Sequence, residues 1–452
     1  MLSKARQCRS CGSTSLTPVF SLDGMGPASK RCSKPGAVEF ALCDPTKDPN
    51  ACGLLQRTSR DGALGRRAPS AAYRANRNHL RCVATEALET LSGRDCAALD
   101  IGCNDGTLLS FYPRWVERYG VDTSDVVSGV GEWAKTLQAD FASSDVDTAY
   151  ADKKFDILTA ISVLEYVDEP RAFLARMKAL LADDGVIIIE TLYAPMALAR
   201  TGFEAFVSGA ASVYSLAVLE RLVTDCGLKI FRGMLTDKEG GSIRLFLTHE
   251  ENEDFDFDPY YARLARLWDE ENALSLRTAH SYHAFYNRAI LAREAFKSEL
   301  AGLRATGETA HLLTSCVQSV AVHQWAGEAA DVITAAVSHT PPEVGAHLCE
   351  NGPILISETE CRAAEPDFLI APAPLKREVL ERWREAIMLG ARIIVATPEP
   401  HIIDSANFAA ELGKSLAGGE NVGEVETLRA ILAASGGPRL VAVGGVAADG
   451  AS

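Results

Sequence analysis

The sequence of 452 residues is short of basic side chains, with 45 Lys and Arg against 60 Asp and Glu and a formal net charge of -15. This charge has the wrong sign for wrapping nucleic acid or lying on an anionic membrane surface, so neither is expected as a partner. No apolar run approaches the roughly 20 residues of a membrane-spanning helix, and the first residues lack an apolar signal region. We therefore expect a cytoplasmic protein with a small-molecule partner; composition sets no oligomeric state.

Cysteine is not scarce, but the spacing of the twelve cysteines argues against a disulfide framework. In a long cytosolic chain, clustered cysteines more often bind metal, and scattered ones pack as small apolar residues. The clustered ones lie in a stretch rich in Gly, Pro, Ser and Asp, with too few periodic apolar residues for a core of its own. Residues 1–66 are therefore predicted to form a small module held by a metal ion.

Four of these cysteines, Cys8, Cys11, Cys43 and Cys52, are ordered as two pairs. Four thiolates in a tetrahedral array suit zinc. The zinc would be structural, because a site closed by four protein ligands leaves no position for a substrate. The first pair has the usual knuckle spacing, whereas the second pair is spread by several residues. Cys32 is a spare thiol that could replace one ligand. The alternative is a set of reduced cysteines in a disordered arm.

The pattern changes at residues 67–250, where short apolar runs alternate with amphipathic segments. This alternation predicts an α/β domain with a parallel sheet flanked by helices. Pro170 is expected to open a helix that Gly185 caps, and the turn-rich residues 237–241 are expected to join an antiparallel hairpin that closes the sheet. The strand-like runs are 97–101, 119–122, 155–160, 185–190, 229–234 and 242–247.

The remainder of the chain divides into three segments. Residues 251–304 have helical periodicity and predict a helical connector. Residues 305–440 predict a second, smaller α/β domain, with strands at 332–337, 368–371 and 391–396 and a helix at 375–388. Residues 441–452 form a tail rich in Gly and Ala that is expected to fray.

The turn after the first strand, Asp100-Ile-Gly102-Cys-Asn104-Asp105-Gly106, is the strongest functional signal. Glycines there allow a ligand to approach the backbone, and acidic side chains can hydrogen-bond hydroxyls or a cationic group. Asp122 ends the next strand, where a carboxylate can take both ribose hydroxyls of a nucleoside. The third glycine of a dinucleotide fingerprint is missing, which favours a cofactor without a pyrophosphate over NAD. The alternative is an ordinary tight turn between strand and helix.

With this turn, the sequence resembles the class I S-adenosylmethionine-dependent methyltransferases, and more closely the three-domain nucleotide-deoxysugar C-methyltransferases. The resemblance covers nearly the whole chain and implies a central Rossmann-like sheet, a zinc module and a C-terminal α/β domain. It rests on six motifs in the family's order: Cys8-Arg-Ser-Cys11-Gly, the Cys43 to Gln56 stretch, Ile101-Gly-Cys-Asn-Asp-Gly-Thr-Leu-Leu, Val163-Leu-Glu-Tyr-Val, Gly240-Gly-Ser-Ile-Arg244 and Ala396-Thr-Pro-Glu-Pro400.

The resemblance also implies roles for individual residues in binding S-adenosylmethionine. Gly102, Asn104 and Asp105 would line its methionine and sugar portions, and Asp122 would hold its ribose. Asp140 and Phe141 would lie near the adenine. The segment from Ser162 to Tyr166 would border the sulfonium that donates the methyl group.

The acceptor side departs from the family. Its Tyr-Arg-Ser-Gly stretch aligns with Ala68-Pro-Ser-Ala, and its His-Glu-His-Leu-Ser-Tyr-Tyr-Ser-Leu stretch aligns with residues 208–216, so the tyrosine and the His-Glu pair are missing. No histidine occurs between His79 and His249. Methylation of carbon beside a keto group needs a base and a donor for the enolate, commonly His, Glu or Tyr. A substitute base or a different acceptor atom is therefore expected.

Our candidates for the substitute are Glu190, Tyr193, Tyr214 and Glu239, in falling order. Glu190 ends a strand at the edge of the sheet where α/β ligand sites form. Tyr214 is equally consistent with a packing role, and Glu239 with a hairpin turn. The same region also retains Glu204, His79, Tyr73 and Arg74.

These observations predict methyl transfer from S-adenosylmethionine to a small, sugar-like acceptor such as a nucleotide-sugar or a related compound, with the methylated atom (C, O or N) left open. In the last domain, residues 307–316 lack the glycine pair and the lysine of the family's nucleotide-sugar loop. The alternative function is a catalytically degenerate scaffold or regulator that binds the cofactor.

Overall fold

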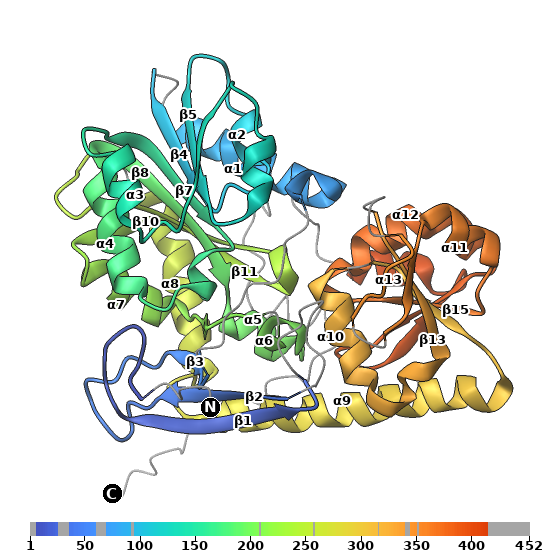
Figure 1. Ribbon diagram of the computed structural model, residues 1–452. Helices are drawn as coiled ribbons and strands as arrows, with labels where there is room; N and C mark the ends of the chain where they lie inside the picture. The colour runs from blue at the N-terminus through green and yellow to red at the C-terminus, as the bar shows by residue number, and fades with distance from the viewer. Residues whose placement is uncertain are drawn as a thin grey trace, which may run out of the picture.

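The computed structural model describes residues 6–25, 36–59, 69–91, 95–207, 209–255, 258–314, 316–339, 344–349 and 352–414. Three sheets organise these residues (Figure 1). Cys32, Ala68, Ser208 and the predicted tail at 441–452 lie outside the described residues. Among the described helices, none is long and apolar enough to cross a membrane.

The N-terminal sheet has the strand order β1-β2-β3-β9, and all of its pairs are antiparallel. Its strands are β1 (Leu16–Asp23), β2 (Ala37–Cys43), β3 (Leu55–Arg57) and β9 (Ser212–Val213). Phe20 and Phe40 from the β1–β2 hairpin pack against Phe206 and Phe285. The hairpin thus completes its core with residues from later in the chain, as the shortage of periodic apolar residues suggested.

The central sheet has the order β10-β11-β8-β7-β4-β5-β6. Its parallel strands are β4 (Ala97–Ile101), β5 (Glu117–Asp122), β6 (Lys135–Gln138), β7 (Phe155–Ile161) and β8 (Leu181–Leu192), and the antiparallel hairpin of β10 (Leu228–Thr236) and β11 (Ser242–His249) closes one edge. The six predicted strands and the hairpin are confirmed.

Helices cover both faces of this sheet. On one face, α1 (Arg74–Thr90) and α2 (Thr107–Ser110) bury apolar residues against β4, β7 and β8. The opposite face is covered by α4 (Pro170–Leu180) and α7 (Leu216–Thr224). Short helices α3 (Ser144–Ala149), α5 (Ala194–Ala199) and α6 (Glu204–Val207) lie in the connections. Pro170 opens α4 as predicted.

Gly185 does not cap α4, which corrects the sequence-based prediction. The helix ends at Leu180, and Gly185 lies within β8. A Cβ atom at Gly185 would come within 3.0 Å of the backbone oxygen of Phe155 on the neighbouring strand. The glycine therefore allows β8 to pass close to β7, where the strand register is irregular.

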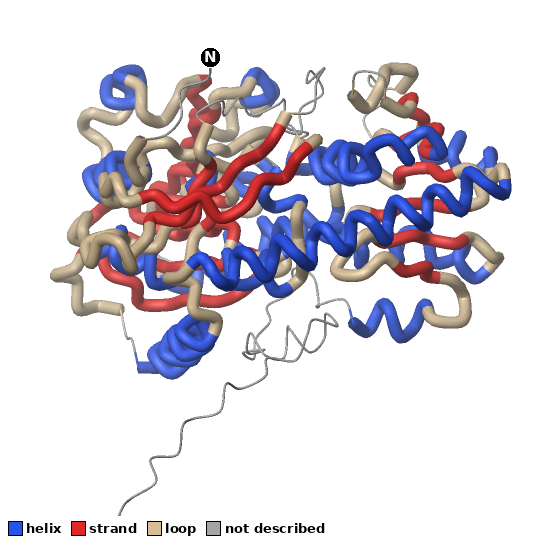
Figure 2. Tube along the Cα trace, turned by 90° about the horizontal axis from the view of Figure 1, so that it is seen from below, coloured by secondary structure: helices blue, strands red, loops and turns tan. Residues whose placement is uncertain are grey.

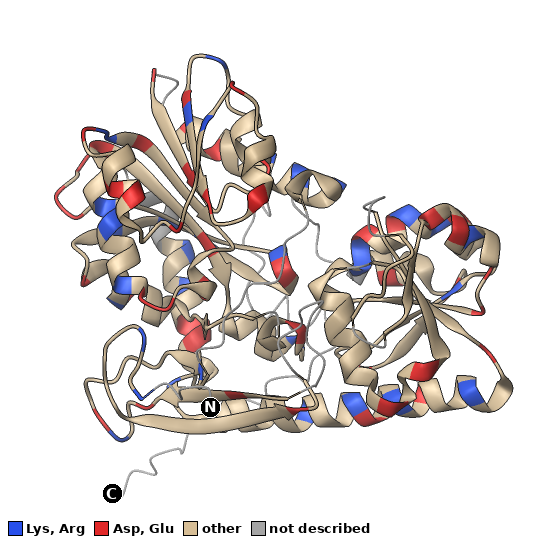
Figure 3. Cartoon of the chain, in the orientation of Figure 1, with Lys and Arg blue, Asp and Glu red and all other residues tan. Residues whose placement is uncertain are grey.

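The C-terminal sheet has the order β14-β13-β12-β15-β16-β17, with only β17 antiparallel to its neighbour. The strands are β12 (Ala310–Leu312), β13 (Ile333–Val337), β14 (Ile354–Ile356), β15 (Phe368–Ala371), β16 (Arg392–Val395) and β17 (His401–Ile403), and its helices are α10 (Val317–Ala326), α11 (Glu358–Ala364), α12 (Lys376–Met388) and α13 (Phe408–Lys414). Basic and acidic side chains are interspersed on α11 and α12 (Figure 3), where Glu358 pairs with Arg362 and Arg382.

Two helices, α8 (Asp258–Ala273) and α9 (Ala279–Thr306), occupy the predicted connector. The long helix α9 runs from the β1–β2 hairpin to the C-terminal sheet (Figure 2). Its face with Tyr282, Phe285, Ala289, Phe296 and Leu300 is buried in the largest apolar cluster. The helix is therefore part of the core that joins the three sheets, in addition to connecting them.

Candidate active site

The turn at residues 102–106 lies where β4 ends, between β5 and β7 in the sheet. Gly102, Asn104 and Gly106 have positive φ angles of 77°, 50° and 74°. Gly102 is exposed although Ile101 and Cys103 on either side are buried. An open glycine backbone at the carboxyl end of the central strand is the position where α/β sheets bind nucleotides.

Two acidic side chains fix the shape of this turn. Asp122 Oδ2 accepts a hydrogen bond of 2.8 Å from the backbone N–H of Asn104, and its Oδ1 accepts one of 2.7 Å from Ser124. Asp105 accepts hydrogen bonds from the backbone N–H and the hydroxyl of Thr107. Each carboxylate oxygen can accept more than one hydrogen bond, so both side chains can still meet ligand hydroxyls or cations.

Asp100 lies beneath the turn and is buried. Its carboxyl accepts a hydrogen bond of 2.6 Å from the hydroxyl of Thr159. Burial raises the pKa of Asp100 to about 7, and the negative charges of Asp122 and Asp105 add to the effect. Asp100 is therefore partly protonated at neutral pH. The negative charge of the region comes from Asp105 and Asp122, and it favours a cationic ligand.

The other predicted cofactor residues lie at the ends of neighbouring strands. Ser162 follows β7 with a φ of 55°, and its N–H donates to the backbone oxygen of Glu190. Asp140 is exposed after β6 and accepts a hydrogen bond from the N–H of Ala142. The ring of Phe141 is buried against Phe173 with 5.1 Å between ring centroids. Phe141 therefore packs in the core, and its contact with adenine stays a prediction.

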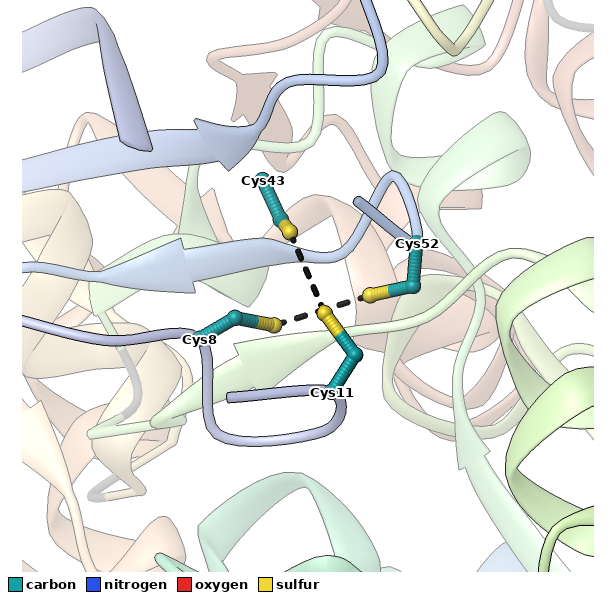
Figure 4. Close-up of side chains that lie close together, drawn as sticks. All are labelled: Cys8, Cys11, Cys43 and Cys52. Atoms are coloured by element: carbon teal, nitrogen blue, oxygen red, sulfur yellow. Dashed lines mark hydrogen bonds between the residues drawn. The ribbon is translucent and has the colours of Figure 1, made fainter. Parts of the chain in front are cut away.

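The four cysteines predicted as metal ligands meet in one cluster (Figure 4). The sulfur atoms of Cys8, Cys11, Cys43 and Cys52 all lie within 4.8 Å of one another, and two pairs are 3.5 Å apart. Ligands about 2.3 Å from a tetrahedral zinc ion would be separated by similar distances. Hydrogen bonds among the four thiols lower the pKa of Cys11 and Cys43 and raise the pKa of Cys8 and Cys52. The donor set and its geometry fit a structural zinc ion.

On the acceptor side, Glu190 belongs to a buried group of charged residues. Its Oε2 accepts a hydrogen bond of 2.6 Å from Arg244, and its Oε1 lies 2.7 Å from Nε2 of His79. Arg244 also pairs with Glu86 at 2.7 Å. Although burial opposes ionisation, Arg244 and His79 hold the pKa of Glu190 well below its usual range. A carboxylate held in this way is a weak base, so the geometry favours an ion-pairing role for Glu190.

The two predicted tyrosines lie next to each other, because Tyr193 and Tyr214 form an isolated β-bridge. Both are fully buried, and burial raises the pKa of each phenol above its ordinary value. The Tyr214 hydroxyl donates to the backbone oxygen of Leu164 at 3.4 Å. Both phenols therefore stay protonated at neutral pH and do not act as bases.

Glu239 lies in the turn between β10 and β11 and has a φ of 54°. In the sequence it is far from Tyr193 and Tyr214. Its Oε2 accepts a hydrogen bond of 2.6 Å from the side chain of Gln318 at the start of α10. Lys238 lies 3.4 Å from the same carboxylate. Glu239 thus joins the central sheet to the C-terminal one.

The sequence analysis did not identify His79, Arg244 and Glu86 as one group with Glu190. His79 and Glu86 lie on one face of α1, seven residues apart, and both are buried. Polar residues at helical spacing within an apolar face were the available signal. Arg244 is more difficult to assign, because only the pairing of β11 with β8 brings it opposite Glu190.

Two protein-family models match adjacent parts of the chain. Residues 70–232 match a family described as a methyltransferase domain. Residues 237–398 match a family described as the C-methyltransferase C-terminal domain. The two matches cover the central sheet and most of the described C-terminal sheet.

Curated relatives match more narrowly. A ubiquinone biosynthesis O-methyltransferase from Rhodopseudomonas palustris (strain HaA2) is 31% identical over 126 residues, which are 26% of this chain and 49% of that protein. The chain thus spans about half the length of this relative. The C-methyltransferase NovU from Streptomyces niveus is 23% identical over 317 residues, covering 68% of this chain and 73% of the relative.

Solved structures with low sequence identity align with less than half of the chain. One is the structure of magnesium protoporphyrin IX methyltransferase from Synechocystis PCC 6803 with bound SAM. The alignment covers 39% of this chain and 80% of that protein's chain at 18% identity, with a TM-score of 0.30. The plantazolicin methyltransferase BpumL with SAH covers 39% and 85% at 14% identity, with a TM-score of 0.32. The chain therefore carries a methyltransferase domain followed by a C-methyltransferase C-terminal domain, and it is similar to NovU over 68% of its length.

Proposed function

We propose that the protein is a cytoplasmic enzyme that transfers the methyl group of S-adenosylmethionine to a small, sugar-like acceptor. The carrying observation is the open turn at Gly102, which Asp105 and Asp122 border at the carboxyl end of β4. S-adenosylmethionine supplies an electrophilic methyl group on a positively charged sulfur. A negative region formed by carboxyl groups complements that charge.

We assign Gly102, Asn104 and Asp105 to the methionine and sugar portions of the cofactor and Asp122 to its ribose. Asp140 and Phe141 are assigned to the adenine side and Ser162 to the reacting end. Asp100 supports the turn from below, since its carboxyl is buried and bonded to Thr159. A structural zinc ion at the four cysteines completes the proposed ligand set.

The sugar-like acceptor is proposed from the six motifs that resemble the nucleotide-deoxysugar C-methyltransferases. The match to the C-methyltransferase C-terminal domain and the similarity to the C-methyltransferase NovU agree with that resemblance. The match to an O-methyltransferase covers only 26% of this chain and 49% of that protein, so it carries less weight for the acceptor. The methyl group would be transferred by direct displacement, with much of the rate coming from holding acceptor and cofactor together.

Calorimetry with S-adenosylhomocysteine, followed by methyl transfer from labelled S-adenosylmethionine to a nucleotide-linked 4-keto deoxysugar, tests the proposal. We expect binding and turnover together. Binding without turnover across nucleotide-sugars would instead support the scaffold function, and absence of binding would exclude both.

A further inference from the structure

Glu204 is a buried carboxyl group with an unusual environment. It is the first residue of α6 and is only 2% exposed. Neither carboxylate oxygen has a partner within ordinary hydrogen-bond geometry, although the backbone N–H groups of Glu204 and Ala373 lie close enough to act on its charge. Burying a carboxyl in this way is costly, and such a group in a native protein calls for a functional or structural explanation.

The other buried carboxyl groups in this part of the chain each accept a hydrogen bond. The donors are Thr159 for Asp100, Thr191 for Glu165, Arg244 for both Glu86 and Glu190, and backbone N–H groups of α7 for Glu271. Glu204 differs from all of them, because neither of its oxygens has such a partner.

The segment that carries Glu204 packs against the residues assigned to the reacting end of the cofactor, because the backbone N–H of Ala211 donates to the backbone oxygen of Glu165. The segment with α5 and α6 directly follows β8, and Leu192 at the end of β8 pairs with Ser242 at the start of β11. The same end of β8 therefore adjoins the turn at 237–241. The 3₁₀ segment Ala373–Leu375 packs on this turn, since a Cβ at Gly240 would lie 3.2 Å from Pro374. Helix α6 lies between the central sheet and α10 (Figure 1).

The charge state of Glu204 is set by burial. Desolvation raises the pKa of Glu204 to about 7, and only the backbone N–H groups of Glu204 and Ala373 oppose the shift. Three elements pack near Glu204. After α5, Arg200 donates hydrogen bonds to the backbone oxygen of Gly240 and to Asp237. The helix α10 carries His323 and begins at Cys316, and the segment Ala373–Leu375 has no titratable side chain. A group with a pKa near the working pH can both take and release a proton.

We propose that Glu204 is the catalytic residue that exchanges a proton with the acceptor, an inference that rests on the proposed methyl transfer. The Glu204 carboxylate takes the proton from the acceptor atom. The electron pair left on that atom forms a bond to the methyl carbon, while the carbon–sulfur bond breaks and its electrons stay on sulfur as S-adenosylhomocysteine. Glu204 is left as a neutral carboxylic acid and returns its proton to water after the products leave.

The test compares the intact enzyme with Glu204→Gln and Glu204→Asp on a nucleotide-linked 4-keto deoxysugar in deuterated water. In Glu204→Gln we expect kcat and the exchange of the α-proton to fall roughly 100- to 10,000-fold, the range for loss of a general base. Affinity for S-adenosylhomocysteine should not change. The acidic limb of the kcat/KM profile, near pH 7 in the intact enzyme, should be absent, and Glu204→Asp should restore part of the rate. The matched control is Glu385→Gln, at an exposed position on α12.

A stability measurement separates this role from a structural one. Because the folded pKa of Glu204 lies above its unfolded value of about 4.3, ionisation lowers stability as the pH rises from about 4 to 7. Glu204→Gln should therefore melt at a higher temperature than the intact protein at pH 8. A lower melting temperature at pH 8, or full exchange and turnover in Glu204→Gln, overturns the proposal. An intact enzyme that binds the cofactor product but leaves the 4-keto sugar unchanged overturns the proposed acceptor class instead, and the role of Glu204 with it.

Discussion

Gly102 must satisfy two constraints that a larger residue cannot meet. Its φ is 77°, and a Cβ atom there would lie 2.6 Å from Cγ2 of Val163. We expect Gly102→Val to weaken binding of S-adenosylhomocysteine at least about tenfold, since a loss of 1.4 kcal/mol suffices. Calorimetry measures the affinity, and Gly129→Val is the control because a Cβ at Gly129 meets nothing within 4 Å. Equal affinity in both variants would contradict the assignment of this turn.

Asp122 contributes through its hydrogen bonds. Asp122→Ala removes the acceptor for the N–H groups of Asn104 and Ser124 and, on the proposed assignment, for the ribose hydroxyls. The expected loss of binding is roughly 1 to 3 kcal/mol. The exposed Asp152 provides the matched control, Asp152→Ala, which should bind as the intact protein does. The cofactor would have to bind elsewhere if Asp122→Ala kept full affinity.

Glu190 illustrates a residue whose predicted role changes with its contacts. Glu190→Gln removes one of the two carboxylates that pair with Arg244 in the buried group. Glu86 is then the remaining ion-pair partner of Arg244. Breaking such a buried pair costs about 3 to 5 kcal/mol. The pKa of Glu190 is lowered in the folded state, so its contribution is present at neutral pH and is lost as the pH falls through that pKa. Urea unfolding at pH 7 measures the loss; little change would restore Glu190 as a candidate base.

At the scale of elements, the sequence was most informative where the pattern within a single strand or helix was enough to predict it. The parallel strands, the hairpin at 228–249 and the start of α4 were predictable from apolar runs, turn residues and Pro170. The pairing of β3 with the two-residue strand β9 was not, because residues 55–56 and 212–213 are far apart in the sequence. The helix α9 was predicted from its periodicity, but the place of its apolar face in the common core was not, because the residues that cover this face lie far away in the sequence.

The same limit applies to the candidate site. The glycine turn, Asp122 and the four cysteines could be recognised because each pattern is local or follows a known spacing. The environment of Glu204 could not, although a charged residue within Gly202-Phe-Glu-Ala-Phe-Val is a visible anomaly. Its lack of a hydrogen-bond partner depends on how α6 packs beneath the C-terminal domain, which no local pattern encodes.

The cysteine cluster belongs to the element scale because it joins a knuckle, the end of β2 and the following loop (Figure 4). Cys11→Ser should reduce zinc from one ion per chain to a lower content and lower the melting temperature, because metal binding contributes to the folding of such modules. Elemental analysis and a thermal scan measure both effects. Cys226→Ser, outside the cluster, should leave zinc content unchanged. Purified intact protein without metal would refute the zinc assignment.

At the scale of the whole molecule, Arg9 connects the cysteine cluster to the proposed active site. Its guanidinium is fully buried and donates to Asp168 at 3.0 Å and to the backbone oxygen of Arg57 at 2.7 Å. Asp168 follows the segment assigned to the sulfonium, and Arg57 donates its N–H to Ala211 beside β9. Because Arg9 lies next to Cys8, an ordered cluster fixes the position from which these bonds are made.

Arg9→Gln should therefore loosen the active-site segments without removing the metal ligands. We expect zinc content to stay at the level of the intact protein, while amide hydrogen exchange becomes faster at residues 162–168 and 211–214. We expect kcat for methyl transfer to decrease more than the affinity for S-adenosylhomocysteine, because these hydrogen bonds of Arg9 do not reach the turn at Gly102. Arg6→Gln, at an exposed position on the same segment, is the control. Unchanged exchange at both segments would show that the metal module and the site are independent, whereas coincident changes would show that the ordered knuckle holds the catalytic segments in place.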